Sequence, residues 1–334
     1  MKKLRAAVVG LGVGEQHIQG YRRHPACEVV ALCDMSVQKL EQMGEKYPGL
    51  RLVDRADLIL EDPDIDVVSI ASYDNYHFEQ IEKGLLHGKH LFVEKPLCLL
   101  PWQLERIQAL VRDNPGLRLS SNLILRCSPR FERIRQMIAG GHFGRLFYTE
   151  GDYEYGRLEK ITQGWRGQID AYSIILGGAV HMVDLLLWLT GDTVTEVSGY
   201  GNRIASKDTT FRFNDFALFL LKFKSGLLAK VSANFGCVKP HFHNLKVFGT
   251  RATFENGPAH GYLYTDRSPA TSPQLIQTPY PGVHKGDLVF NFVQSILEEA
   301  PAIVSTQDVF NTMSVCMAAE RAVSDSTTVV LGES

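Results

Sequence analysis

The sequence predicts an α/β protein of two domains, the first built on a parallel sheet and the second on a large, open, mostly antiparallel sheet. The chain has 334 residues, more than one ordinary core accommodates at roughly 150 residues per domain. In its first third, short apolar runs alternate with helical stretches, as in a parallel sheet covered on both faces. Later apolar runs follow one another across short turns, as hairpins do.

The first domain is expected to span residues 1–122. Five helical stretches connect its strands, and the best defined are Val37–Lys46, Tyr76–His87 and Pro101–Asp113. Continuous apolar runs bounded by polar residues are typical of strands buried on both faces. Six runs are expected as strands: Leu4–Val9, Val29–Cys33, Leu50–Val53, Val67–Ala71, His90–Val93 and Leu117–Ser120.

The second domain is expected to span residues 123–334. It begins with an Arg-rich helix, Pro129–Ala139, and has later helices at Val180–Leu189, Gly286–Glu299 and Gln307–Val323. Its basic run is expected to form a solvated helix face, with contact to an anionic substrate as the alternative: Arg126, Arg130, Arg133 and Arg135. The expected strands are Phe147–Tyr155, Val194–Gly201, Phe216–Phe223, Leu227–Asn234, His243–Phe248 and Ala252–Glu255.

Composition limits the partners. Hydrophobic residues make up 45% and charged residues 22%, and the formal net charge is −2, which gives no electrostatic reason to expect nucleic acid. No apolar stretch approaches the roughly 20 residues of a membrane span. The six cysteines form no Cys-x-x-Cys pair, so we expect free thiols in a reducing compartment, a cytoplasmic location and no metal.

A glycine-rich loop follows the first strand and opens a helix. It contains Gly10, Gly12, Val13 and Gly14. Glycines allow a tight turn and a close approach to a pyrophosphate, which the helix N-terminus then meets with free N–H groups. The spacing departs by one residue from the usual dinucleotide fingerprint, so the loop alone is a weak signal.

An acidic residue ends the second strand. Asp34 follows the loop by about 20 residues, where a carboxylate accepts hydrogen bonds from a ribose 2′-hydroxyl. Its charge would repel a 2′-phosphate, and Met35 next to it supplies no positive charge. The pattern favours NAD over NADP, with NADP left open. The alternative is that Asp34 is only a solvated strand end or a helix cap.

The fifth strand runs into Glu94-Lys95-Pro96. Ligands of doubly wound sheets collect beyond the carboxyl ends of the strands. A lysine held there by a following proline is therefore well placed to meet a substrate near the cofactor.

At these residues the chain resembles the Gfo/Idh/MocA oxidoreductases, which are named for glucose-fructose oxidoreductase and inositol dehydrogenase. The shared motifs are the glycine loop, Ala71–His77, Gly88–Pro96, Gly140–Gly144, Trp165-Arg166, Gly177–Asp184 and Trp188–Gly191.

The resemblance implies a Rossmann domain that binds NAD, an α/β domain, and a substrate held between them. It implies that Lys95 contacts the substrate hydroxyl and the nicotinamide region, and that His181 is the acid/base. Relatives often carry an aspartate where this chain has Gly177, which puts their three-residue mechanism in doubt here. Further cofactor contacts are expected from Ala71, Ser72, Tyr73, His77 and Glu94.

Alcohol oxidation requires a base for the hydroxyl proton, and histidine titrates nearest to neutral pH. A nearby ammonium, that of Lys95, would stabilise the alkoxide. His181 is expected to begin a helix, whose N-terminus would favour the neutral ring. Asp184, one turn on, is expected to orient His181 or a sugar hydroxyl. The alternative for His181 is a capping or core role.

Aromatic and arginine residues precede this helix. They suit the apolar face, the hydroxyls or a phosphate of an activated sugar, and their alternative is sheet packing. His241 and His243 share a strand face but have no evident third partner for a metal. The expected substrate contacts are Tyr153, Tyr155, Arg157, Trp165, Arg166 and Tyr172, with Lys95, His181 and Asp184.

Two functions remain open at this point. The first is an NAD-dependent dehydrogenase that oxidises a ring hydroxyl of a sugar or a nucleotide-linked sugar. The second is a non-catalytic regulator that senses a dinucleotide or a sugar on the same fold. Apolar residues on both faces of the strand Phe216–Phe223 also predict a homodimer or homotetramer, since an uncovered apolar face normally finds a partner.

Overall fold

The computed structural model describes residues 3–332, so the outermost residues of both expected domains lie outside the described part. The chain divides into two compact units, which are described separately. Unit 1 runs to residue 124 and also contains residues 284–310. Unit 2 contains residues 125–283 and the chain from residue 311 onward. No helix within residues 3–332 is long and apolar enough to cross a membrane.

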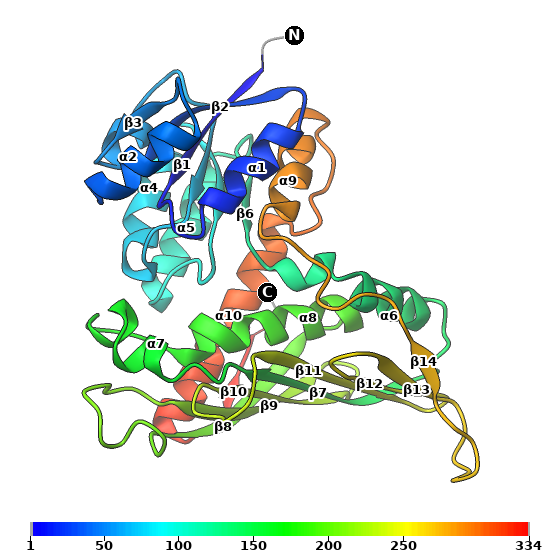
Figure 1. Cartoon of the computed structure of the whole chain (residues 1–334). Helices are drawn as coiled ribbons and strands as arrows, with labels where there is room; N and C mark the ends of the chain where they lie inside the picture. Colours follow the sequence, from blue (N-terminus) through cyan, green and yellow to red (C-terminus); the bar gives the residue numbers. More distant parts are fainter. Residues whose placement is uncertain (1–2, 333–334) are drawn as a thin grey trace. The chain divides into compact units, whose positions relative to one another are not determined.

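Unit 1 is built on the predicted parallel sheet. Its six strands lie in the order β3-β2-β1-β4-β5-β6, and every neighbouring pair is parallel (Figure 1). The order reverses beside β1, which places the switch point between β1 and β4. The strands are β1 (Leu4–Val9), β2 (Cys27–Cys33), β3 (Arg51–Val53), β4 (Val67–Ile70), β5 (His90–Val93) and β6 (Leu119–Ser121). The helices are α1 (Glu15–Arg23), α2 (Val37–Lys46), α3 (Asp57–Leu60), α4 (His77–Leu86) and α5 (Pro101–Asp113).

A late segment of the chain packs in unit 1. Helix α9 (Asp287–Leu297) lies against α1 (Figure 1), at a point where a Cβ on Gly20 would lie only 2.4 Å from the Gly286 carbonyl oxygen. The Thr306 hydroxyl donates to the Leu119 carbonyl at 2.7 Å. The expected second domain, 123–334, included these residues. The sequence alone does not reveal that residues 284–310 pack in unit 1, because their contacts are with segments far away in the chain.

Unit 2 contains a nine-stranded sheet in the order β14-β13-β12-β11-β7-β10-β9-β8-β15. Only β7 and β10 pair in parallel, so the sheet is mostly antiparallel, as predicted. The last three strands were not predicted. The strands are β7 (Leu146–Glu154), β8 (Val194–Asn202), β9 (Phe216–Phe223), β10 (Leu228–Asn234), β11 (Phe242–Gly249), β12 (Thr253–Asn256), β13 (Gly261–Tyr264), β14 (Gln274–Ile276) and β15 (Val329–Val330).

The two faces of this sheet differ. Helix α8 (Val180–Thr190) packs on one face, where Gly151 of β7 leaves room for Met182 (Figure 1). The other face carries a charged centre, in which the Lys230 ammonium lies 3.2 Å from Glu150 and 3.1 Å from Asp152. The exposed Leu220 of β9 pairs with Lys230 in the strand register and so lies on the same face. The charged centre makes this face less apolar than the sequence suggested. The other helices of unit 2 are α6 (Pro129–Ala139), α7 (Glu159–Thr162) and α10 (Thr306–Asp325), which begins in unit 1.

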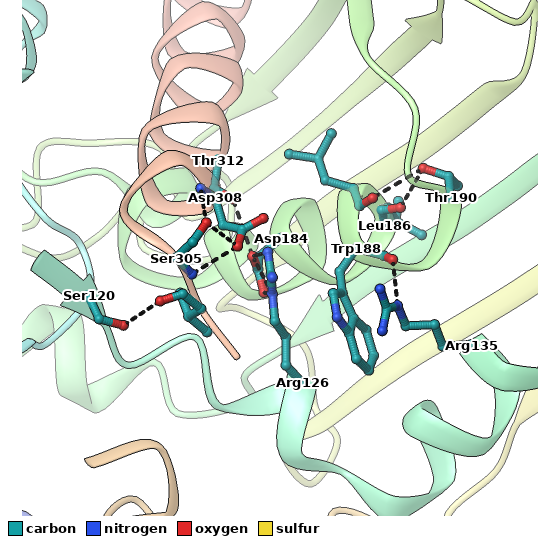
Figure 2. A network of polar contacts seen from close by, with 12 residues as sticks. Ser120, Arg126, Arg135, Asp184, Leu186, Trp188, Thr190, Ser305, Asp308 and Thr312 are labelled. Atoms are coloured by element: carbon teal, nitrogen blue, oxygen red, sulfur yellow. Dashed lines mark hydrogen bonds and ion pairs between the residues drawn. The ribbon is translucent and has the colours of Figure 1, made fainter. Parts of the chain in front are cut away.

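A buried ion pair fixes α8 (Figure 2). The Arg126 guanidinium donates to both carboxylate oxygens of Asp184, with Nη2 2.6 Å from Oδ1 and Nε 3.0 Å from Oδ2. Thr312 of α10 adds a longer contact at 3.3 Å. Arg126 and Asp184 are both almost fully buried. The pair therefore ties the start of unit 2 to the middle of α8.

Arg130 is also buried. Its guanidinium donates to the Asn256 side chain at 2.9 Å and to nearby backbone carbonyls. The expectation of a solvated basic face is thus wrong for Arg126 and Arg130, because protein acceptors replace their water. It is confirmed for Arg133 and Arg135, which are exposed. Arg135 also lies over the Trp188 ring, 4.7 Å from its centroid.

We predict that Arg126→Met lowers the free energy of unfolding by about 3–5 kcal/mol, because it leaves the buried Asp184 carboxylate without its guanidinium. Chemical denaturation followed by circular dichroism measures the change. The control is Arg106→Met, which breaks a partly exposed pair with Glu82 and should cost less than about 1 kcal/mol. Equal losses in the two variants would contradict this role for the buried pair.

Candidate functional site

In unit 1 the predicted cofactor residues meet at the carboxyl edge of the sheet. Backbone hydrogen bonds continue the strand ladders past the last strand residues. The Gly10 N–H donates to Cys33 at 2.8 Å, the Ala71 N–H to Val9 at 2.7 Å, and the Glu94 N–H to Ile70 at 2.8 Å. The glycine loop, the loop after β4 and the Glu-Lys-Pro segment therefore lie side by side.

The three glycines have different reasons to lack a side chain. Gly10 has a φ of +87°, and a Cβ there would lie 2.3 Å from the Ala71 carbonyl oxygen. A Cβ on Gly14 would lie 2.1 Å from the Gly10 carbonyl oxygen. Gly12 has nothing within 4 Å of that position. Gly10 makes the turn, Gly14 allows the close approach of α1, and Gly12, beside the half-buried Val13, leaves the open space that a pyrophosphate requires.

Asp34 holds this loop in place. Its Oδ2 accepts a hydrogen bond from the Leu11 N–H at 2.7 Å, and its Oδ1 accepts one from the Ser36 N–H at 2.9 Å. The carboxylate thus caps a turn and lies beside the glycine loop, and its contact with a ribose stays a prediction. Each carboxylate oxygen keeps further acceptor capacity for a ribose hydroxyl. Met35 is 63% exposed.

Glu94 is the centre of a buried polar cluster that sequence reasoning missed. Its Oε1 accepts from the Asn122 amide at 2.8 Å and lies 3.3 Å from His17 Nε2. The Asn122 amide also reaches the Lys285 carbonyl at 3.2 Å. Burial alone would raise the pKa of Glu94, but the His17 hydrogen bond, Lys285 and Asn122 outweigh it and lower the pKa strongly. A carboxylate therefore persists beside Lys95.

The remaining predicted cofactor residues differ in how exposed their side chains are to a ligand. His77 is fully buried, with Nδ1 2.7 Å from the Pro96 carbonyl and Nε2 3.2 Å from the Ser72 carbonyl. It links the loop after β4 to the Glu-Lys-Pro segment, and its ring nitrogens are already engaged. Tyr73 is 45% exposed and Lys95 is half-buried.

In unit 2, His181 lies among aromatic rings on the α8 side of the sheet. Its ring stacks near Tyr153 of β7, with centroids 5.9 Å apart. Tyr153 in turn stacks near Tyr155 at 5.7 Å. These three predicted residues are therefore brought together, with His181 only 9% exposed.

His181 does not begin its helix. A π-helical segment, Ile175–Ala179, directly precedes α8, and the Ser173 hydroxyl caps the run by accepting from the Leu176 N–H at 2.9 Å. The free N–H groups of the helix start therefore lie more than one turn before His181. The expectation that a helix N-terminus favours its neutral form is wrong for this reason.

The predicted arginines flank the aromatic rings. Arg157 lies over Tyr155, 5.4 Å from the ring centroid, and Arg166 lies over Trp165 at 4.5 Å. Burial raises the pKa of Tyr153 strongly, although the charges of Arg166 and Arg157 act in the opposite sense. Both arginines are thus close enough to Tyr153 for their charges to affect its pKa.

Two other predicted substrate-binding residues, Asp184 and Tyr172, are buried against other residues of the protein. Asp184 is engaged by Arg126, so its carboxylate is held by the protein and does not point to solvent. Tyr172 is buried against Gly177, where a Cβ would lie 2.5 Å from the Tyr172 hydroxyl oxygen. Tyr172 thus occupies the space next to position 177 that a longer side chain would take.

Metal ligands were not expected from the sequence. Among the described residues, no group of three or more His, Cys, Asp and Glu side chains is arranged to hold a metal ion. His241 and His243 lie close together, with ring centroids 4.7 Å apart.

The parallel sheet, the glycine loop and the carboxyl-edge residues define a dinucleotide-binding oxidoreductase. Two family models match the chain: the oxidoreductase family with an NAD-binding Rossmann fold over residues 4–122, and the GFO/IDH/MocA C-terminal domain over residues 131–255. Together they cover well over half of its length. The chain belongs to the Gfo/Idh/MocA family of NAD-binding oxidoreductases, as the sequence motifs predicted.

Named relatives carry related activities. The scyllo-inositol 2-dehydrogenase (NAD(+)) of Bacillus subtilis (strain 168) is 27% identical over 260 residues, which cover 75% of this chain and 73% of the relative. Two solved structures share the fold over nearly all of both chains. The WlbA dehydrogenase from Bordetella pertussis, in complex with NADH and UDP-GlcNAcA, has a TM-score of 0.84 at 19% identity and covers 100% of each chain. The scyllo-inositol dehydrogenase from Lactobacillus casei, with bound NAD(H) and scyllo-inositol, has 0.80 at 18% and covers 98% of this chain and 99% of that one.

We predict that Asp34→Ala weakens NAD binding by about 10- to 100-fold, the usual effect of losing a hydrogen bond to a charged group. NADP binding should change much less, because the same change removes a charge that repels the 2′-phosphate. Calorimetric titration with both cofactors measures the difference. Asp54→Ala, which removes an exposed carboxylate after β3, is the matched control. Equal weakening of both cofactors would restrict Asp34 to holding the loop.

Proposed function

We propose that this protein is an NAD-dependent dehydrogenase that oxidises a ring hydroxyl of a sugar or a nucleotide-linked sugar by hydride transfer. The observation that carries the proposal is the placement of His181 beside the stacked rings of Tyr153 and Tyr155. A buried imidazole next to aromatic faces suits a polyhydroxylated ring, which needs both a base and an apolar surface. Membership of an NAD-binding oxidoreductase family supports the same reaction type.

The cofactor would be held by the carboxyl edge of unit 1, where the open space at Gly12 fits a pyrophosphate. When bound, NAD supplies the hydride acceptor. Tyr73 is exposed to contact it, whereas His77 acts through the loops that it joins. The residues proposed to bind it directly are Gly10, Gly12, Val13, Gly14, Asp34, Ala71, Ser72, Tyr73, Glu94 and Lys95.

The two catalytic residues have different roles in this proposal. His181 takes the proton of the reacting hydroxyl, since a neutral imidazole is the base suited to neutral pH. Lys95 stabilises the alkoxide with its ammonium group, and the Glu94 carboxylate next to it in sequence keeps that region electrostatically favourable for a cation. Asp184 supports His181 indirectly, because its pair with Arg126 fixes α8.

The substrate is proposed to be a cyclic polyhydroxyl compound. Tyr153 and Tyr155 offer stacking surfaces, and Trp165 offers another. Arg157 and Arg166 carry forked donors that suit the phosphates of an activated sugar. These features favour a nucleotide-linked sugar over a free acid or aldehyde. A homodimer or homotetramer and a cytoplasmic location stay predictions from the sequence.

We predict that His181→Ala lowers turnover by about 10²–10⁴-fold, the usual effect of removing a general base. NAD affinity should stay nearly unchanged, because the proposed NAD contacts belong to unit 1. Steady-state kinetics and NAD titration measure the two quantities. His142→Ala, which changes an exposed histidine of unit 2, should alter neither. Unchanged turnover in His181→Ala would return this residue to a core role.

The substrate prediction is tested by following NADH absorbance with a panel of nucleotide sugars, free hexoses and inositols. We expect a nucleotide-linked sugar to give the highest kcat/KM, because only it engages the arginines. A free inositol or hexose oxidised at least as efficiently as every nucleotide sugar would remove the activated-sugar claim and leave the dehydrogenase. Binding of NAD without oxidation of any panel member would instead favour the regulator.

A further inference from the structure

His243 is a second imidazole beside His181. It lies on β11 opposite Tyr153 of β7 in the strand register, and directly opposed residues project from the same face of a sheet. Ring contacts agree with this placement. The His243 centroid lies 5.4 Å from that of Tyr153 and 6.0 Å from that of His181. His243 therefore lies on the face of unit 2 that carries the proposed base.

Tyr280 determines which ring nitrogen of His243 carries the proton. The Tyr280 hydroxyl oxygen accepts the His243 backbone N–H at 2.9 Å and lies 2.8 Å from His243 Nδ1. Because the oxygen already accepts one hydrogen bond, its own proton is the group that best serves Nδ1. Nδ1 is then an acceptor, and Nε2 carries the hydrogen.

The surroundings of His243 keep its ring neutral. Burial, with a smaller contribution from His241, lowers the pKa of His243 to about 3. Burial raises the pKa of both Tyr153 and Tyr280, so these neighbours stay neutral as well. The other titratable groups facing the ring are the imidazoles of His241 and His181. His243 is therefore a fixed, uncharged donor at ordinary pH.

We propose that His243 is a substrate-binding residue that selects for a second hydroxyl on the ring that His181 deprotonates. Its Nε2–H donates to the oxygen of that hydroxyl, and Tyr280 is a positioning residue that fixes the donor tautomer. The inference rests on the proposed dehydrogenase function and adds to it a requirement for a polyol with a neighbouring hydroxyl. A compound that lacks this hydroxyl would leave the Nε2–H unpaired and bind less tightly.

The first test compares two substitutions of His243. His243→Phe keeps a ring but removes the donor, whereas His243→Gln restores an amide N–H close to the position of Nε2. With the best substrate of the panel, His243→Phe should raise KM about 3- to 10-fold, the usual effect of one neutral hydrogen bond, and change kcat much less. His243→Gln should recover most of the loss. Unchanged KM in His243→Phe, or no recovery in His243→Gln, would overturn the proposal.

Deoxy analogues of the same substrate identify the hydroxyl. For one analogue, the unmodified protein should already show the raised KM, and His243→Phe should add nothing further. If His243→Phe raises KM equally for every analogue, the residue shapes the site without contacting a hydroxyl, and the proposal fails.

A readout independent of turnover is the protonation of the ring. In protein labelled with ¹⁵N-histidine, long-range NMR correlations should show His243 as the Nε2–H tautomer throughout the pH range 5–8. Tyr280→Phe should produce a mixture of tautomers, while Tyr262→Phe, a matched change at an exposed tyrosine of β13, should not. An Nδ1–H tautomer in the unmodified protein would contradict the role of Tyr280.

A separate experiment distinguishes failure of the dehydrogenase function from failure of the His243 proposal. If no panel member is oxidised, that function falls, and the same variants are titrated with the panel sugars by calorimetry in the presence of NAD. Weaker binding by His243→Phe, recovered by His243→Gln, would still support the donor role. Equal binding by all variants, or binding by none, would overturn it.

Discussion

Unit 1 of this protein depends on the close approach of the glycine loop after β1 to the backbone that follows β4. A Cβ at Gly10 or Gly14 would lie within 2.3 Å of a backbone oxygen, so no other residue fits without moving the loop. The same approach places Gly12 over open space and brings Asp34 within 2.7 Å of the Leu11 N–H. One steric constraint thus forms the loop, aligns its acidic neighbour and leaves room for a ligand.

Buried charges perform the equivalent task in unit 2. Arg126 and Asp184 satisfy one another beneath α8, and Arg130 is held by carbonyls around β12. Removing charges of this kind singly is costly, because the remaining partner stays buried. The charges therefore fix the helix that carries His181, while the exposed Arg157 and the half-buried Arg166 lie over the aromatic rings of Tyr155 and Trp165.

Sequence reasoning predicted the features that depend on local patterns. Continuous apolar runs indicated the parallel strands, and the glycine spacing indicated the loop, since both follow from backbone geometry. The π-helical segment before α8 was missed because it leaves no distinctive periodicity, and it moved the helix start away from His181. The contacts of Glu94 with His17 and Asn122 join residues far apart in the chain. No spacing rule finds them, and the same is true of Tyr280 beside His243.

The central claim is that this chain moves a hydride from a ring carbon of a polyol to NAD. The most direct measurement uses a substrate deuterated at its ring carbons and mass spectrometry of the reduced cofactor. The account predicts one deuterium in each NADH molecule formed, because the hydride passes directly from carbon to nicotinamide. NADH that carries no deuterium, or no NADH from any deuterated polyol, would contradict it.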